Sequence, residues 1–323
     1  MRLVDTLPLR ALLLGVAVIG IAFVGLRPRT GDWFAAYRDL DEVTTRMKLL
    51  AERHPELVTM RALGSSVEGR PIHALEIGRG AAGIALDGGQ HAREWVSVMV
   101  PICIADRLVA QSEEPRIRRL LDAVRFHIVP VANPDGYAYT WTHDRFWRKN
   151  RRGGYGVDLN RNYSVAWGHA GSSGDRDSPN YRGAHAFSEP ESRALASLFE
   201  RNPIVAHVDF HSFSQVVVYP WSHKRELPAD AARFAELANV ISAAMSSAHG
   251  HRYAVRAGAD LAIGSSGTLG DWAYATHGVL SFLVELRPRP GGDGFLLPPD
   301  QITPTCDESF AGVLALAEAL SRY

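Results

Sequence analysis

The sequence predicts an α/β fold, a single domain in which a central mixed β-sheet is flanked by helices. Short apolar runs that end in glycine or turn residues alternate along the chain with longer segments of helical periodicity. No linker-like break separates them, and 323 residues of which 46% are hydrophobic can build a large core. Such a mixture is typical of one sheet with helices packed against it. We therefore expect one domain over residues 31–323, preceded by a separate segment, residues 1–30.

Residues 1–30 carry an uncharged apolar run between arginines. Arg2 and Arg10 precede residues 11–26, which hold no charge, and Arg27 and Arg29 follow. The run predicts an export signal, and the poor cleavage site favours an uncleaved anchor over a cleaved peptide. A buried N-terminal helix is the alternative. We expect an exported protein that is secreted, periplasmic or anchored to the membrane through residues 7–26, where Arg10 would reach the interface.

The first half of the domain predicts helices and strands in turn. Residues 31–54 predict one helix, because apolar side chains from Phe34 to Leu50 recur at helical spacing and Pro55 follows. Short apolar runs at 57–64, 71–78 and 82–89 predict strands. Residues 95–110 predict a buried helix, and 124–136 a strand that runs into an Asn-Pro-Asp-Gly turn.

The second half contains a long loop and then further helices and strands. Residues 148–185 are rich in Gly, Ser, Asn and Arg and too long for a plain connection, which favours a functional loop. The remaining patterns predict helices at 189–201, 229–250 and 307–323 and strands at 204–212, 216–220 and 279–286.

The balance of charge in the sequence gives no support to nucleic-acid binding. Lys plus Arg and Asp plus Glu both number 35, so no overall charge attracts the chain to nucleic acid.

The chain has two cysteines, Cys103 and Cys306, which lie in apolar or amphipathic segments. They could form one disulfide, and two buried free thiols are at least as compatible with the sequence.

A histidine and a glutamate three residues apart suggest part of a metal site. His91 and Glu94 can both face one ion from a tight turn or helix start. Catalytic zinc needs a third protein ligand, and the strand at 204–212 offers His207 and His211. His211 stands where the apolar alternation gives way to Ser-Phe-Ser-Gln. A His-x-x-Glu match is weak by itself, because such a histidine more often makes structural hydrogen bonds.

Six motifs in order make the sequence resemble a known family. They are HAREW, NPDGYAYT, RFWRKNRR, GVDLNRNY, HSFSQVVVYP and ELRP. In this order they resemble the zinc metallocarboxypeptidases of the carboxypeptidase A/B type, from about residue 33 to the C-terminus. The resemblance implies one Zn²⁺ held by His91, Glu94 and His211. Two neutral nitrogens and one carboxylate leave a positive ion that acidifies bound water.

The resemblance also implies the catalytic residues. Glu285, at the end of an apolar strand, corresponds to the general base and acid, and apolar neighbours could raise its pKa. A salt bridge to Arg287 is the structural alternative. Arg148 corresponds to the residue that polarises the scissile carbonyl, although a basic run such as RFWRKNRR by itself more often means a solvated face.

Substrate-binding residues follow from the same resemblance. Asn160 and Arg161 would bind the free C-terminal carboxylate, because a guanidinium binds a carboxylate bidentately and an amide adds a donor. Arg93, Arg145 and Phe213 would line subsites further along the peptide.

The sequence departs from the family pattern at two positions. Ile263 stands where the family places a mobile tyrosine over the substrate, and Tyr253 or Tyr274 could replace it only if the loop register differs. Gly270 stands where the family sets its side-chain preference. A glycine there favours neutral or hydrophobic C-terminal residues, although Asp260 nearby could still attract a basic one.

The sequence therefore predicts a zinc-dependent carboxypeptidase that hydrolyses the C-terminal peptide bond of peptides or proteins. We expect a monomer without a large inhibitory pro-domain, and no nucleic-acid partner. Two alternatives remain: an exported amidohydrolase acting on peptidoglycan stem peptides or γ-glutamyl bonds, and a catalytically weak zinc-containing peptide-binding protein.

Overall fold

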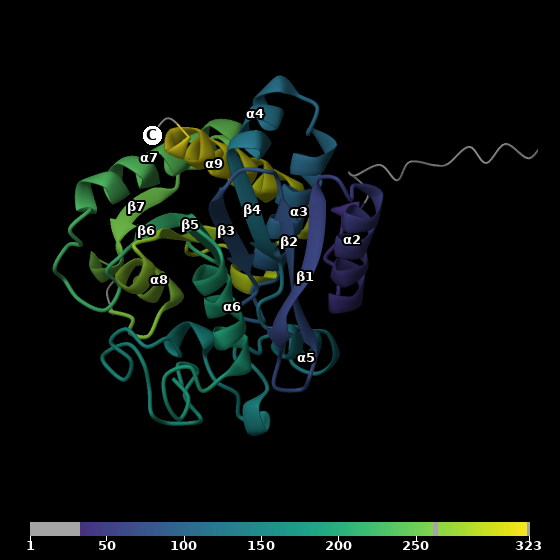
Figure 1. The fold of residues 1–323 in the computed structure, drawn as a ribbon. Coiled ribbons are helices and arrows are strands. Elements are labelled where there is room, and N and C mark those ends of the chain that lie inside the picture. Colours follow the sequence, from purple (N-terminus) through teal and green to yellow (C-terminus); the bar gives the residue numbers. More distant parts are fainter. Residues whose placement is uncertain (1–32, 261–263, 322–323) are drawn as a thin grey trace, which may run out of the picture.

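A single mixed sheet of eight strands organises the molecule (Figure 1). The computed structural model describes residues 33–260 and 264–321. The predicted leader, residues 1–30, therefore lies outside the described residues, as does Ile263. The strand order is β1-β2-β4-β3-β5-β8-β6-β7, with parallel pairing from β4 through β3 and β5 to β8. The strands are β1 (Val58–Ser65), β2 (Pro71–Ile77), β3 (Ala82–Gly88), β4 (Val124–Val129), β5 (Ile204–Ser212), β6 (Val216–Tyr219), β7 (Ala254–Ala257) and β8 (Leu280–Leu286).

Helices cover both faces of the sheet, and each face has its own hydrophobic cluster. The larger cluster lies under α2, α3, α4, α7 and α9, and the smaller one under α6 and α8. This confirms the predicted architecture, one α/β domain with a mixed sheet. The helices are α2 (Leu40–Arg53), α3 (Trp95–Ala110), α4 (Pro115–Ala123), α5 (Pro134–Thr142), α6 (Pro190–Arg201), α7 (Ala231–His249), α8 (Leu269–His277) and α9 (Ile302–Leu320).

The N-terminal helix is shorter than its apolar pattern predicts. It begins at Leu40, because Asp39 accepts a hydrogen bond from the Glu42 backbone while the Glu42 side chain accepts one from the Asp39 backbone. This capping box therefore sets the N-terminal end of the helix. Tyr37, which shares the helical spacing, lies before the helix and donates its hydroxyl to the Leu297 carbonyl.

Two helices appear where the sequence did not suggest them. α4 precedes β4, and α5 begins inside the predicted Asn-Pro-Asp-Gly turn. Asn133 caps α5 by accepting from the Gly136 backbone, and Pro134 occupies the first helical position. Both features favour a helix start as well as a turn, so the turn prediction was wrong at this point.

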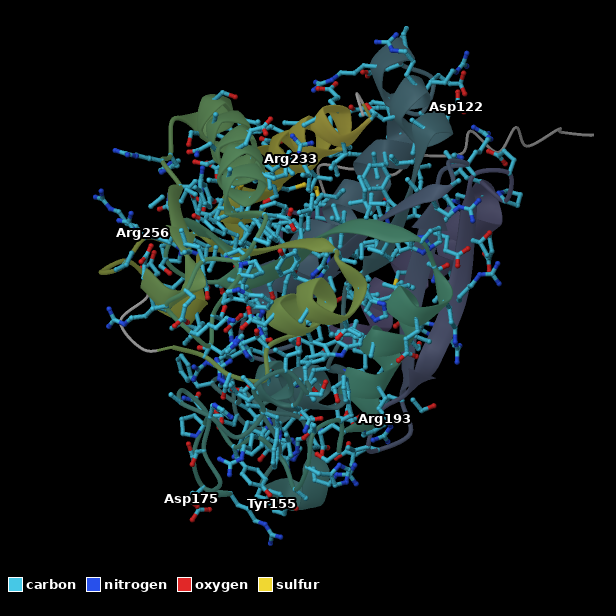
Figure 2. All side chains as sticks on the ribbon, turned by 60° about the vertical axis from the view of Figure 1, so that its left-hand side comes forward. Asp122, Tyr155, Asp175, Arg193, Arg233 and Arg256 are labelled. Atoms are coloured by element: carbon cyan, nitrogen blue, oxygen red, sulfur yellow. A yellow bond between two sulfur atoms is a disulfide. The ribbon has the colours of Figure 1, made fainter. Side chains whose placement is uncertain are left out.

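A disulfide joins Cys103 on α3 to Cys306 on α9. It lies within the larger core and is drawn as a yellow bond in Figure 2. The sequence left this pairing open, because the two residues are 203 positions apart.

The described residues contain no single helix that could cross a membrane by length and composition. Together, α3 and α4 would be long and apolar enough, but they form a bent pair. Most of α3 is buried in the protein core.

Candidate active site

The predicted site residues gather at the carboxyl ends of the parallel strands. β3 ends at Gly88, and the chain then turns through Gly89, whose φ of +66° suits glycine, to reach His91 before α3. A side chain at Gly88 would have no room, because a Cβ there would lie 1.9 Å from the Ser97 carbonyl oxygen. The two glycines thus let α3 begin directly above the sheet, at the edge where open α/β sheets bind ligands.

The register between β5 and β8 places three pairs of residues on one face of the sheet. His211 lies opposite Glu285, Asp209 opposite Leu283, and His207 opposite Ser281. These are alternate positions along each strand, so all six side chains point away from the α3 face. The intervening residues, Val208 and Phe210 among them, belong to the larger core.

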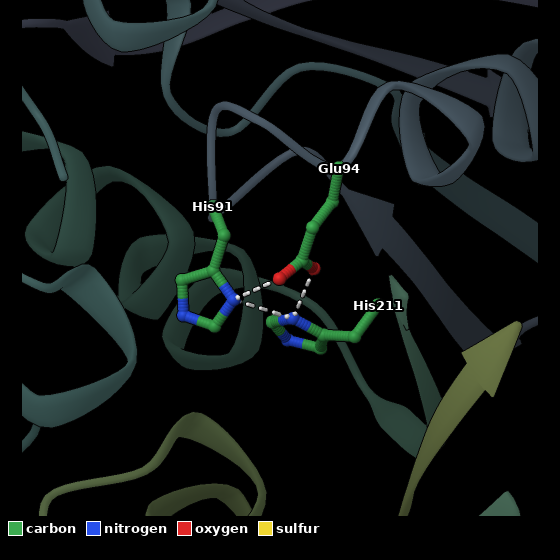
Figure 3. Close-up of side chains that lie close together, drawn as sticks. All are labelled: His91, Glu94 and His211. Carbon is green, nitrogen blue, oxygen red and sulfur yellow. Dashed lines mark hydrogen bonds and ion pairs between the residues drawn. The ribbon is translucent and has the colours of Figure 1, made fainter. Parts of the chain in front are cut away.

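The three predicted metal ligands meet in space (Figure 3). His91 Nδ1 lies 2.9 Å from Glu94 Oε1, and His211 Nδ1 lies 3.0 Å from Glu94 Oε2. The two Nδ1 atoms are 2.9 Å apart. The ligand atoms all lie within 4.8 Å of one another, close enough to bind one ion together.

The outward nitrogens of both histidines have carboxylate partners. His91 Nε2 lies 3.2 Å from Asp158 Oδ1, and His211 Nε2 lies 2.9 Å from Asp209 Oδ2. If each Nε2–H donates to its carboxylate, each Nδ1 presents a lone pair to the shared point. Histidines that bind metals are held in this way, so the residues present fit zinc.

Glu285 faces the same cavity as the three ligands. Its Oε2 is buried and has no hydrogen-bond partner in the described part of the chain. Burial, and then the negative charge of Glu94, raises the pKa of Glu285 to about 8. The salt bridge to Arg287 that the sequence allowed does not form, because Arg287 pairs with Glu308 instead.

Arg148 enters the cavity from the long loop. Its guanidinium donates two hydrogen bonds to Asp158 Oδ2, at 3.1 and 2.8 Å, and lies 3.9 Å from Glu94 Oε1. Asp158 therefore positions both His91 and Arg148. The loop at 148–185, predicted to be functional, supplies these side chains through backbone turns rather than regular structure.

Asn160 and Arg161 lie in the short 3₁₀ segment Leu159–Arg161 and line the cavity. Arg161 donates to the Gly171 and Asn160 carbonyls and to Ser265 Oγ. Asn160 accepts from the Leu269 backbone, and its amide nitrogen lies 3.2 Å from His211 Nε2. The pair is thus adjacent to the metal ligands.

Phe213 lines the cavity, whereas Arg93 lines a neighbouring cleft with Arg148. Phe213 packs edge-on against Phe295. Arg93 lies over the Phe295 ring, with its guanidinium carbon 4.2 Å from the ring centre. Arg145 lies outside the lining of the central cavity. It donates to the Arg93 and Phe295 carbonyls and stacks over Trp95, so it supports these residues from behind.

The sequence departs from the family pattern at Gly270 and at Ile263. Gly270 lines a small cavity next to the central one. Neither candidate substitute for the tyrosine at Ile263 reaches the site. Tyr253 is buried and donates to Glu308, and Tyr274 donates to Asp230. Asp260 is exposed and lines neither cavity.

Asp158 and Asp209 are functional candidates that the sequence reasoning missed. Asp209 lies two residues before His211 on a strand, so alternation alone places it on the same face. Asp158 lies two residues before Asn160, inside a motif already singled out. Both signals were present in the sequence.

Comparisons with known proteins agree with this geometry. Residues 43–312 match the family model described as zinc carboxypeptidase. Carboxypeptidase B of Astacus astacus is 38% identical over 298 residues, which cover 88% of this chain and 97% of the relative. Human carboxypeptidase B is 35% identical over 306 residues, covering 91% of this chain and 73% of the relative.

Solved structures show the same similarity in three dimensions. The crystal structure of thrombin activatable fibrinolysis inhibitor superimposes with a TM-score of 0.86 at 33% identity, covering 91% of this chain and 76% of that one. Carboxypeptidase A from Helicoverpa armigera gives 0.82 at 31% identity, with coverages of 90% and 75%.

The chain belongs to the zinc carboxypeptidase family. It is a metallocarboxypeptidase, a peptide hydrolase that removes residues from free C-termini, and His91, Glu94 and His211 are positioned to bind its one metal ion. The alternatives of an amidohydrolase for cell-wall or γ-glutamyl bonds and of a catalytically weak binding protein are not favoured by these findings.

Proposed function

We propose that the central cavity, of about 350 Å³, binds the C-terminal end of a peptide and hydrolyses its last bond. Zinc held by His91, Glu94 and His211 would supply Lewis acidity and acidify a bound water. Glu285 takes a proton from the attacking water and passes it to the leaving amine. Arg148 donates to the carbonyl oxygen as negative charge develops there.

Substrate binding rests on the cationic and amide groups of the same cavity. Asn160 and Arg161 bind the terminal carboxylate, since both line the cavity beside the ligands. Phe213 and Arg93 contact residues further along the peptide, and Arg145 keeps Arg93 in place. One observation carries this proposal: Glu285 Oε2, in the same cavity as the three ligands, has no hydrogen-bond partner among the described residues.

We also propose that the protein is exported. The apolar run within residues 7–26 supports a signal or membrane anchor, and the Cys103–Cys306 disulfide supports an oxidising compartment. We propose a monomer, as the sequence analysis expects.

Release of amino acids from a defined peptide mixture tests the activity. We expect the purified protein to free single C-terminal residues, to stop on addition of a chelator and to recover with zinc. Peptides with an amidated C-terminus are the matched control and should resist, because they lack the carboxylate that Asn160 and Arg161 would bind. Internal cleavage, or release that a chelator does not affect, would contradict the proposal.

A further inference from the structure

A second, deeper cavity continues from the central one along the sheet. The two cavities share five lining residues, which are Asn160, Val218, Ser222, Thr268 and Leu283. The register places Asp209, Leu283 and Val218 side by side on β5, β8 and β6. This row lies two residues, or about 7 Å, below the row that holds His211 and Glu285. A side chain that leaves the catalytic centre in this direction therefore meets the row of Asp209.

Asp209 lines the deeper cavity and is only 2% exposed. Its Oδ2 accepts from Gln90 Nε2 at 2.8 Å and lies 2.9 Å from His211 Nε2. Its Oδ1 is buried and has no partner among residues 33–260 and 264–321. A buried carboxylate oxygen without a donor is costly, so its retention calls for a ligand that supplies one.

Two further oxygens near Asp209, those of Ser281 and Gln90, are also available as acceptors. His207 Nε2 lies 2.5 Å from Asp87 Oδ1, so His207 donates there and accepts from Ser281 Oγ at its Nδ1, 2.8 Å away. The oxygen of Ser281 then keeps its lone pairs for the cavity that it lines. Gln90, whose Nε2 donates to Asp209, likewise has its Oε1 buried without a partner in the described chain.

The cavity contains no positive charge of its own. Among the described residues, those that line it are two aspartates and neutral residues, with no lysine or arginine. The second aspartate, Asp271, is occupied by the backbones of Ser222 and His223 and by the His223 ring. Asp209 is therefore the carboxylate left for a ligand, and it favours a cation.

Gly270 keeps the end of this cavity open. A Cβ at Gly270 would lie 3.1 Å from Ser281 Oγ, so a larger side chain there would fill the space beside Ser281. The free space is about 20 Å³, which suits one water-sized group. An ammonium group has this size and brings three donors.

We propose that Asp209 is the specificity-determining residue of this enzyme and that it binds the ammonium group of a C-terminal lysine. The inference rests on the proposed function, because it requires the substrate's carboxylate to lie at Asn160 and Arg161. This proposal replaces the expectation, based on Gly270 alone, that the enzyme prefers substrates with a neutral or hydrophobic C-terminal residue. The small residue at 270 leaves room for a cation whose partner is Asp209, on a different strand.

The first test compares two peptides that differ in one group. One ends in lysine and the other in norleucine, whose side chain is that of lysine with the terminal ammonium replaced by a hydrogen atom. We expect kcat/KM to be at least tenfold higher for the lysine peptide. Hydrolysis of both at equal rates, or faster release of norleucine, would overturn the proposal. Release of neither would instead refute the proposed function, so the two failures are distinguishable.

The Asp209→Asn variant separates specificity from support of the metal site. Asparagine keeps an acceptor for His211 but loses the charge. A role limited to His211 would lower kcat/KM for both peptides by the same factor, whereas our proposal predicts that the lysine-to-norleucine ratio falls at least tenfold. Asp260→Asn is the matched control, because Asp260 is an exposed acid of the same region, and it should leave the ratio unchanged. The proposal would be contradicted if Asp260→Asn lowered the lysine-to-norleucine ratio of kcat/KM while Asp209→Asn left it unchanged.

An inhibition assay on the unmodified enzyme covers the case in which Asp209→Asn does not fold. With the norleucine peptide as substrate, 6-aminohexanoate should inhibit at least tenfold more strongly than hexanoate, since both supply the carboxylate and only the first supplies the ammonium. Equal inhibition by the two acids would overturn the proposal.

Discussion

At the scale of single residues, the two histidine ligands are held by neighbouring carboxylates that have no direct part in the chemistry. Asp158 contacts His91 and Arg148, and Asp209 contacts His211. Glu285 differs, because its Oε2 has no partner in the part of the chain that the structure describes. The proposed base therefore has a carboxylate oxygen without such a contact, whereas the two histidine ligands are held by theirs, and we expect different outcomes when each kind of residue is substituted.

Substitution of Glu285 by glutamine should abolish most of the turnover while zinc still binds. The amide cannot take a proton from water, and general-base catalysis typically contributes about 10²–10⁴-fold. We expect kcat to fall within that range and the zinc content, measured by elemental analysis, to remain one per chain. A variant with nearly unchanged kcat would show that another group is the base.

Substitution of Asp158 by asparagine should weaken the metal site. Loss of the carboxylate behind a metal-binding histidine typically costs about 10–100-fold in metal affinity. We expect a loss in this range by competition with a chromophoric chelator, together with a lower kcat because Arg148 loses its partner. The matched control is Asp122→Asn, an exposed aspartate that pairs with Arg79 at 3.5 Å. Equal affinities in the two variants would contradict the role of Asp158.

At the scale of elements, the start of α6 joins two segments below the site. Glu191, in its first turn, accepts from the Val67 backbone with one oxygen and from Asn150 Nδ2 with the other. Val67 lies in the β1–β2 turn, and Asn150 lies at the start of the long loop, two residues after Arg148. Burial raises the pKa of Glu191 to about 7 from 4.5.

This raised pKa predicts the direction of a pH effect on stability. Between pH 4.5 and about 7 the unfolded chain loses the proton of Glu191 while the folded chain keeps it. The contribution of this group to stability is therefore complete below pH 4.5 and is lost as the pH rises through 7. Glu191→Gln cannot ionise, so its midpoint in urea relative to the parent should rise between pH 5 and pH 8. A constant difference across this interval would contradict the prediction.

At the scale of the whole molecule, the disulfide connects the helix behind the metal site to the C-terminal helix. Cys103 lies on α3, which begins one residue after Glu94, and Cys306 lies on α9. The bond closes a segment with a sequence separation of 203 residues, so it restricts the unfolded chain strongly. It contributes to the stability of the frame on which His91 and Glu94 are placed.

Removal of both cysteines as alanines should lower the free energy of unfolding by about 2–5 kcal/mol. Urea unfolding with zinc present measures this difference, and kcat at low temperature should stay near that of the parent because neither sulfur lines the central cavity. Reduction of the parent by dithiothreitol provides an independent comparison. Unchanged unfolding in both experiments would show that the bond contributes nothing.

Patterns within the sequence were enough to predict the class of fold and the order of most elements, and the resemblance of its motifs to a known family supplied the three metal ligands. Apolar periodicity reports burial on one face of a helix or strand, and it located α3, α6, β5 and β8 well. It failed at the start of α2 and at α5, where capping by Asp39 and Asn133 decides between helix and turn. His91 and Glu94 are only three residues apart, so their place in one metal site could also be predicted from the sequence.

Which distant groups meet became known from the three-dimensional fold. The fold pairs Cys103 with Cys306 and Arg287 with Glu308 rather than Glu285. It also leaves Asp209 with an oxygen that has no partner in the described part of the chain, in a cavity kept open by Gly270. The reason is physical. Strand register and helix packing set distances between residues far apart in the chain, and a pattern within one segment contains no information about the element that will lie beside it.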